Sequence, residues 1–288
     1  MTQTMDITTL EDGIAAREAD VPDLRPGCAK RIVWADKPCV KTPVVILFIH
    51  GFSASPEELR PLPDLVAQEL RANIYFTRLT GHGQTGDALA NATFAAWQAD
   101  VAEAVAVART IGDEIVLMGC STGCTLATVA MVNGLQPKAA VFISPNFGLR
   151  SVAAQGLLDM PGVRHWGHYV AGKARKFAAI NEGHAAYWTN SYPTQALYPM
   201  ADAVRAVWKS DLSKIKTPTL FAINNADQVV HPKRTRTVMA RWGGPTTEVV
   251  VTPGPGDDPN GHVMAGAIFS PGQTVPLAQR ISAWLQGL

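Results

Sequence analysis

The sequence is poor in the features that mark membrane-spanning, disulfide-stabilised and nucleic-acid-binding proteins. No stretch approaches the roughly 18 consecutive apolar residues of a membrane span. The 288 residues carry a net charge of only +1, so bulk electrostatics give no reason to expect a nucleic acid as partner. There are only four cysteines; Cys28 and Cys39 could pair, but a reduced chain is the simpler expectation. The first 25 residues show no secretory signal, so we expect a cytoplasmic protein.

Short apolar runs alternate with amphipathic segments over much of the chain. Residues 43–49 form a continuous β-branched run, which is typical of a strand buried on both faces. Apolar residues recur at helical spacing over residues 93–110. Further strand-like runs cover 31–34, 74–79, 114–118, 139–143, 219–223 and 248–251. This alternation predicts an α/β protein with a doubly wound, mostly parallel sheet.

The chain divides into three parts by composition. Residues 1–26 are polar and weakly patterned, which predicts a loose N-terminal arm. Residues 27–146 and 211–288 carry the alternating pattern of the core, including an expected helix over residues 55–71 that its prolines interrupt. Residues 147–210 lack a clear buried strand and are rich in aromatic residues and histidine, which predicts a helical cap inserted over the carboxyl edge of the sheet.

The most informative motif is Gly-Cys-Ser-Thr-Gly at residues 119–123. It follows an apolar strand and precedes an apolar helix, which is the context of a nucleophile elbow. In such an elbow a strained turn lifts the serine hydroxyl clear of the sheet. Gly119 and Gly123 leave room for the helix to approach the strand closely. Ser121 is therefore the candidate nucleophile.

A serine hydroxyl needs a base to take its proton and an acid to orient that base. In this topology the acid and then the histidine follow the serine along the chain. Asp227 comes just after the 219–223 strand, and His262 lies in the loop after the last strand. Either residue alone would be read as an ordinary loop residue, but their order and their places at strand ends favour a triad. Asp257 and Asp258 compete for the acid role, but they lie too close to His262 in a loop rich in glycine and proline to brace it well.

Two backbone amides are expected to stabilise the oxyanion of an acyl-transfer reaction. One is the amide of Thr122, at the start of the helix. The other is the amide of Phe52, in the loop after the first central strand, where Gly51 gives the backbone freedom to turn. His50 is expected to order this loop by hydrogen bonding, and Ser53 to add a hydroxyl.

Substrate contacts are expected from the elbow, the Phe52 loop and the cap. We assign them to His50, Gly51, Ser53, Cys120, Trp166, Tyr169 and Trp188. Aromatic side chains over a serine site would hold an apolar acyl or aryl group. The partner is thus a small ester; no cofactor is expected, and the cap histidines lack the tight spacing of metal ligands. The sequence leaves the choice between monomer and homodimer open.

The combined pattern resembles the α/β-hydrolase fold family, and within it the carboxylesterase and monoacylglycerol-lipase-like branch. The similarity spans about residues 44–288 and rests on His50-Gly51-Phe52, Leu79-Thr80-Gly81-His82-Gly83, the 119–123 motif, Asp227 and Gly261-His262. The resemblance implies a helical cap that lines the substrate pocket. It also implies a triad of Ser121, Asp227 and His262, and an oxyanion hole formed by the amides of Phe52 and Thr122. The sequence departs from the family at Cys120, where a larger residue often precedes the serine, and in its long loop at 253–261.

The sequence thus predicts a serine hydrolase that cleaves carboxylic esters through an acyl-enzyme on Ser121. Serine C–C bond hydrolases, lactonases and peptidases use the same scaffold and remain alternatives. Dehalogenase and the usual epoxide-hydrolase chemistry are disfavoured, because those enzymes place Asp where Ser121 stands. A non-catalytic ligand receptor is a further alternative, disfavoured by the presence of all three triad residues.

Overall fold

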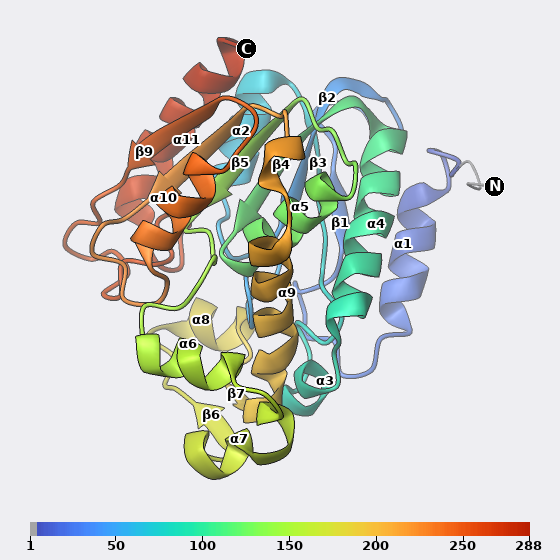
Figure 1. Ribbon diagram of the computed structural model, residues 1–288. Coiled ribbons are helices and arrows are strands. Elements are labelled where there is room, and N and C mark those ends of the chain that lie inside the picture. The colour runs from blue at the N-terminus through green and yellow to red at the C-terminus, as the bar shows by residue number, and fades with distance from the viewer. Residues whose placement is uncertain (1–4) are drawn as a thin grey trace.

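A seven-stranded sheet runs through the centre of the molecule in a computed structural model that describes residues 5–288 (Figure 1). The strand order is β1-β3-β2-β4-β5-β8-β9, and every neighbouring pair is parallel except β1 and β3. The predicted doubly wound, mostly parallel sheet is therefore confirmed. Its strands are β1 (Arg31–Val33), β2 (Thr42–Ile49), β3 (Asn73–Phe76), β4 (Gly112–Cys120), β5 (Ala139–Ile143), β8 (Thr219–Ile223) and β9 (Thr246–Val250).

Helices cover both faces of this sheet. One face carries α4 (Phe94–Ile111), α5 (Thr122–Val132), α9 (Leu197–Lys209) and α10 (Pro232–Ala240), and the other carries α2 (Leu62–Leu70) and α11 (Pro271–Gln286). The short α3 (Gly86–Ala90) precedes α4.

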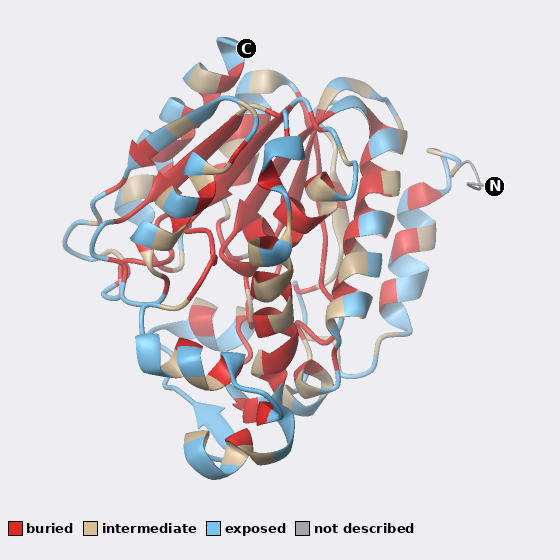
Figure 2. Ribbon diagram, viewed as in Figure 1, coloured by how far each residue is buried: buried red, intermediate tan, exposed pale blue. Residues whose placement is uncertain are grey.

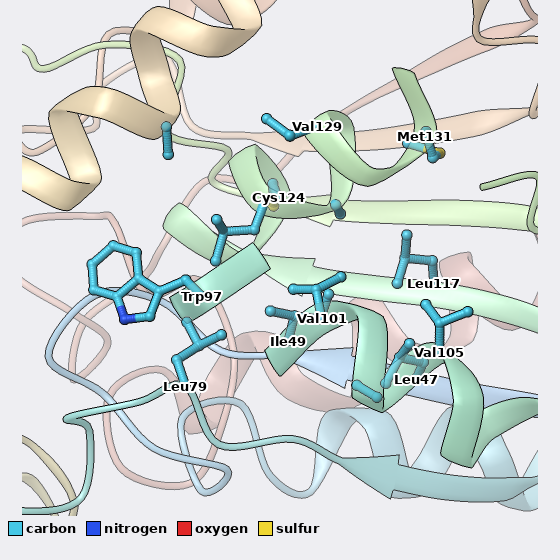
Figure 3. Packing of buried hydrophobic residues seen from close by; sticks show 14 of the residues in the cluster. Leu47, Ile49, Leu79, Trp97, Val101, Val105, Leu117, Cys124, Val129 and Met131 are labelled. Carbon is cyan, nitrogen blue, oxygen red and sulfur yellow. The ribbon is translucent and has the colours of Figure 1, made fainter. Parts of the chain in front are cut away.

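Alternate residues of β2 enter the two hydrophobic cores. Leu47 and Ile49 pack with Val101 and Val105 of α4 in the core that Figure 3 shows. The intervening Phe48 points to the opposite face and joins the core built with α2 and α11. A strand buried on both faces needs apolar side chains at every position, which is why the continuous run was a reliable strand signal.

The cap segment, residues 147–210, gathers at one end of the sheet (Figure 1). It contains α6 (Val152–Asp159), α7 (Val163–Ala171), α8 (Glu182–Tyr187) and α9, and a small antiparallel sheet of β6 (Ala174–Lys176) and β7 (Ser191–Pro193) that the sequence did not predict. Much of its surface is exposed, whereas the central strands are buried (Figure 2). The C-terminal half of α9 leaves this end and packs on α5.

The prediction of a loose N-terminal arm is wrong for residues 10–19, which form helix α1 (Leu10–Ala19). Leu10 and Ile14 are spaced four residues apart and are both buried against the core. Glu18, one turn further, forms a buried ion pair with Arg78, with 2.7 Å between Oε2 and Nε. Only one apolar residue per turn of α1 contacts the core. The helical periodicity of apolar residues is therefore weak in this segment.

The helix expected over residues 55–71 begins later than predicted. Residues 56–61 form turns, and α2 starts only at Leu62. The Ser55 hydroxyl accepts the Glu57 amide at 3.3 Å, so it caps a turn and not a helix. The four cysteines are free thiols, so the possible Cys28–Cys39 pair is not formed. Among residues 5–288, none of the helices combines the length and hydrophobicity that crossing a bilayer requires.

Candidate active site

The turn between β4 and α5 places Ser121 in a strained backbone conformation. Its φ is 48° and its ψ is −113°, outside the usual regions for a residue with a side chain. A Cβ on Gly123 would lie 2.0 Å from the Ile49 carbonyl oxygen, and one on Gly119 would lie 2.9 Å from the Cys124 nitrogen. The predicted close approach of helix and strand is therefore confirmed, and no larger residue fits at either glycine.

Ser121, His262 and Asp227 meet at the carboxyl end of the sheet although 141 residues separate the first two. His262 Nε2 lies 3.0 Å from Ser121 Oγ, and His262 Nδ1 lies 2.9 Å from Asp227 Oδ2. All three side chains are largely buried. The structure thus joins a hydroxyl, an imidazole and a carboxylate in one hydrogen-bonded chain.

Backbone hydrogen bonds fix the carboxylate and join the two loops. Asp227 Oδ1 accepts the amides of Val229 at 2.7 Å and Val230 at 2.9 Å, which leaves Oδ2 for the imidazole. The side chain of Asn224 donates to the Gly261 carbonyl at 2.9 Å, next to His262. These bonds hold the acid and the imidazole in one rigid unit.

Asp258, the competitor for the acid role that the sequence offered, binds the backbone beside His262. It is 5% exposed, and its Oδ2 accepts the amides of His262 at 2.9 Å and Val263 at 2.8 Å. Asp258 therefore fixes the backbone that carries His262, because its carboxylate accepts hydrogen bonds from main-chain amides. Asp257 holds the amides of Gly254 and Gly272 instead.

The electrostatic surroundings of His262 favour its protonated form. Burial alone would lower the pKa of His262, but the charge of Asp227 and its hydrogen bond to Nδ1 act in the opposite direction. Glu58 and Asp258 add smaller contributions in the same direction, so the pKa of His262 is raised above its ordinary value. An imidazole of this kind accepts a proton readily.

The loop after β2 is held by two side chains. Burial lowers the pKa of His50 to about 4, so this imidazole is neutral at pH 7. Its Nε2 accepts the Leu79 amide at 3.1 Å, which leaves a proton on Nδ1 to donate to the Gly51 carbonyl at 2.8 Å. Since carbonyl and N–H point in opposite directions across a trans peptide, the Phe52 N–H points away from His50. On the other side, the Gly51 amide donates to Glu58 Oε2 at 2.6 Å.

The two amides expected in the oxyanion hole belong to segments that border Ser121 in the fold. Thr122 follows Ser121 at the start of α5, where helix geometry leaves the first N–H groups unpaired. A Cβ on Gly51 would lie 3.2 Å from Ser121 Cβ, so the loop that carries Phe52 passes directly over the nucleophile. Within residues 5–288 neither the Phe52 nor the Thr122 amide donates a hydrogen bond.

A cavity of about 370 Å³ opens over this site. Its wall includes two of the seven predicted contact residues, Ser53 and Trp188. Phe52, Ser121 and His262 line it as well. The remaining wall is mainly apolar and comes from the cap and the last loops: Leu149, Phe177, Ile180, Tyr192, Met200, Val263 and Phe269. The space suits a small molecule with an apolar part.

Five predicted contact residues lie elsewhere. Tyr169 is 80% exposed, and Trp166 donates from Nε1 to the Pro161 carbonyl at 3.2 Å. Helix α7 thus points both rings away from the cavity. His50 and Gly51 belong to the same loop as Phe52 but do not line the cavity. Cys120 is fully buried, and its thiol faces the Glu58 carboxyl.

Two buried polar residues, Glu58 and Asn146, are among the wall residues that the sequence interpretation missed. Glu58 stands in a Glu-Glu pair that was read as the first turn of a helix, so nothing in the sequence signalled its burial. Asn146 is 2% exposed, and within the described part of the chain its side chain makes no hydrogen bond. It lies three residues after the end of β5, and its position near a strand end was a usable signal.

The chain is similar to a known protein family and to a known lipase. Residues 46–279 match the model of a family described as the alpha/beta hydrolase family. The chain is 27% identical over 190 residues to the thermostable monoacylglycerol lipase of Bacillus sp. (strain H-257), over 66% of this chain and 73% of that protein.

Two solved structures share the fold at low sequence identity. One comes from a study of LipS and LipT, two metagenome-derived lipolytic enzymes; the TM-score is 0.74 at 20% identity, over 92% of this chain and 100% of the other. The other is a soluble variant of monoglyceride lipase from Saccharomyces cerevisiae in complex with a substrate analog; the TM-score is 0.65 at 10% identity, over 90% and 91% of the two chains.

Proposed function

Because the chain belongs to the alpha/beta hydrolase family and is distantly homologous to monoacylglycerol lipases and esterases, we propose that it hydrolyses carboxylic esters through Ser121. The observation that carries the proposal is the hydrogen-bonded chain from Ser121 Oγ through His262 to Asp227. A serine, an imidazole and a carboxylate in this order form the minimal device for nucleophilic acyl transfer.

In the first half of the reaction Ser121 Oγ attacks the ester carbonyl carbon. His262 Nε2 takes the hydroxyl proton, and Asp227 stabilises the imidazolium that forms. The carbonyl oxygen becomes negative and accepts hydrogen bonds from the Phe52 and Thr122 amides. Collapse of this intermediate breaks the bond to the alcohol oxygen, which leaves with the proton from His262, and an acyl group stays on Ser121.

In the second half a water molecule replaces the alcohol. His262 takes a proton from the water as it attacks the acyl carbon, and the same two amides hold the oxyanion. The intermediate then releases the carboxylic acid, and the proton on His262 returns to Ser121 Oγ. The enzyme is thereby restored, and the net reaction is the addition of one water across the ester bond.

The apolar wall favours esters with an apolar acyl or aryl group of modest size. Trp188, packed on Phe269 with ring centroids 5.0 Å apart, forms a firm part of that wall. The cap segment is joined to the Phe52 loop through the Thr189 amide, which donates to the Ser53 carbonyl at 2.8 Å. We propose that residues 147–210 act as the cap that sets acyl preference.

Hydrolysis of short p-nitrophenyl esters tests the proposal. We expect turnover by the wild type and a loss of about 10⁴-fold or more in kcat for Ser121→Ala, with an unchanged melting temperature. Ser151→Ala is the matched control, because that exposed hydroxyl caps α6 outside the cavity. A panel with lactones, peptides and C–C substrates separates the other reactions of this scaffold. Ester turnover by Ser121→Ala at the wild-type rate would contradict the proposal.

A further inference from the structure

Glu58 is a buried carboxyl group for which the reaction so far has no use. It is 3% exposed and belongs to the wall of the cavity that contains Ser121 and His262. Between residues 5 and 288 no lysine or arginine forms an ion pair with it. Burying a carboxyl group without a cation costs stability, so the burial of Glu58 at this place indicates a functional role.

The Glu58 carboxyl touches the loop that carries the Phe52 amide. Its Oε2 accepts the Gly51 N–H at 2.6 Å. A Cβ at position 51 would lie 2.7 Å from Glu58 Oε1 and 3.2 Å from Ser121 Cβ. Gly51 therefore lies close to both this carboxyl and the nucleophile. With His50 on the Gly51 carbonyl and Glu58 on the Gly51 amide, both polar groups of that residue are held.

We propose that Glu58 is a positioning residue of the reaction, which fixes the Gly51 peptide and hence the Phe52 N–H, and whose charge governs both the oxyanion and His262. The inference rests on the proposed function, since it concerns the same oxyanion. A carboxylic acid and a carboxylate both have an oxygen that accepts the Gly51 N–H, so protonation preserves the position of the loop and changes only its electrostatics.

The groups around Glu58 leave His262 as its main titrating neighbour. The pKa values of Cys120 and Cys124 are raised well above their ordinary range by burial, so both thiols stay neutral. His50, on the loop itself, is neutral as described above. His262 also faces Asp227 and Asp258, whose carboxylates are already engaged.

The charge of Glu58 opposes the reaction in two ways. Burial raises the pKa of Glu58 to about 7, although the Gly51 N–H and His262 act in the opposite direction. When Glu58 is ionised, its charge repels the oxyanion that forms close by, and it also helps to keep the proton on His262, which must be neutral to act as a base. When Glu58 is protonated, both effects vanish.

The pH profile of Glu58→Gln tests this role of the charge. Gln still accepts the Gly51 N–H but cannot ionise. We expect the rise of kcat/KM with pH, measured on p-nitrophenyl butyrate, to move to lower pH by about 0.5–1.5 units, with a higher plateau than in the wild type. Glu57→Gln is the matched control, because it removes the same charge from the adjacent residue, whose carboxylate pairs with Arg31 and Arg60 outside the cavity. Its profile should match the wild type.

Glu58→Ala tests the positioning role. We expect kcat to fall by about 10- to 100-fold with KM changed by less than about threefold, since the loss falls on oxyanion stabilisation. Glu58→Gln should restore kcat to at least the wild-type value. If Glu58→Ala does not fold, as judged by circular dichroism, the pH profile of Glu58→Gln decides.

The outcomes separate this inference from the proposed function. An active wild type whose pH profile superimposes on that of Glu58→Gln would overturn the inference and leave ester hydrolysis standing. Wild-type kcat in folded Glu58→Ala would overturn the positioning role in the same way. A folded wild type that neither hydrolyses esters nor reacts with a fluorophosphonate would overturn both proposals.

Discussion

The core and the cap segment surround the reacting groups in different ways. From the core come Ser121 on a turn between β4 and α5, and Asp227 and His262 on loops that hydrogen bonds tie together. The cap segment adds side chains such as Trp188 and Phe177 to the cavity wall, but much of its own surface is exposed (Figure 2). In the core, hydrogen bonds between parallel strands make the backbone rigid. In the cap, α6 and α7 are short, exposed helices.

On the proposed function, this difference would make the core set the reaction rate and the cap set the substrate preference. A group that must lie within hydrogen-bonding distance of another needs a rigid support, because small displacements cost large factors in rate. A wall that only excludes water and fits an acyl chain tolerates more variation. Changes in the core should therefore act on kcat or on folding, and changes in the cap on KM and selectivity.

The largest effect is expected from Asp227→Asn. An Asn amide facing His262 Nδ1 would reverse the donor and acceptor roles and hold the wrong tautomer. We expect kcat on short esters to fall by about 10³- to 10⁴-fold, with a small change in stability. Steady-state kinetics check this, and Asp113→Asn, an exposed position at the start of β4, serves as the control. A loss below about tenfold would contradict the role given to Asp227.

The next effect concerns folding and the contact of α1 with the core. Glu18→Gln leaves Arg78 buried without its carboxylate, and breaking such a pair costs about 3–5 kcal/mol. Urea unfolding should show a loss of this size, whereas Asp12→Asn on the exposed side of the same helix should change little. A loss below about 1 kcal/mol for Glu18→Gln would mean that α1 is not an integral part of the core.

A pH-dependent stability is expected from Glu58. Its pKa is raised from 4.5 to about 7 on folding, so the folded protein binds this proton more tightly than the unfolded chain. The resulting penalty is small below about pH 4.5, grows as the pH rises, and is complete above about pH 7, at up to roughly 3 kcal/mol. The gain in unfolding free energy from Glu58→Gln should therefore be about 2 kcal/mol larger at pH 8 than at pH 5.

Urea unfolding of Glu58→Gln and Glu57→Gln at both pH values measures this effect. Glu57 lies at the half-buried surface, and its substitution should give the same change in stability at pH 5 and pH 8. A Glu58→Gln variant whose advantage shrinks as the pH rises would contradict the direction of the pKa shift of Glu58.

The smallest effect is expected in the cap. Trp188→Leu enlarges the cavity next to the acyl chain, so we expect kcat/KM to fall about tenfold for an octanoate ester and little for an acetate ester. Tyr169→Leu removes an aromatic residue from the same segment, but one that is 80% exposed, and should leave both substrates unchanged. Equal losses on acetate and octanoate would show that Trp188 does not contact the acyl chain.

The parts of the fold that could be predicted from the sequence carry a local signal. For the buried run at 43–49 and for the strand–turn–helix around Ser121, about ten consecutive residues are enough to predict the local structure. Asp227 and His262 could be found because parallel strands bring their carboxyl ends to one edge of the sheet. Helix α1 was missed because its two core contacts, Leu10 and Ile14, leave little periodicity.

The remaining errors concern the direction of single side chains. Trp166 and Tyr169 were expected in the cavity because they are aromatic, but α7 points both side chains away from it. Amino-acid composition does not determine how a helix is rotated about its own axis. Glu58 was expected only in the first turn of a helix, and nothing in the sequence indicated its burial, since a carboxyl group is rarely buried without a cation. Its burial depends on the turns at 56–61, which only the folded chain displays.

Covalent labelling tests the central claim most directly. The wild-type protein is treated with a fluorophosphonate, and the adduct is located by peptide mass spectrometry. If Ser121 is the nucleophile activated by His262, one adduct per chain should form on Ser121, and labelling should be nearly abolished in folded His262→Ala. An adduct on another serine, such as Ser53 in the same cavity, or no adduct on the folded protein, would contradict the account.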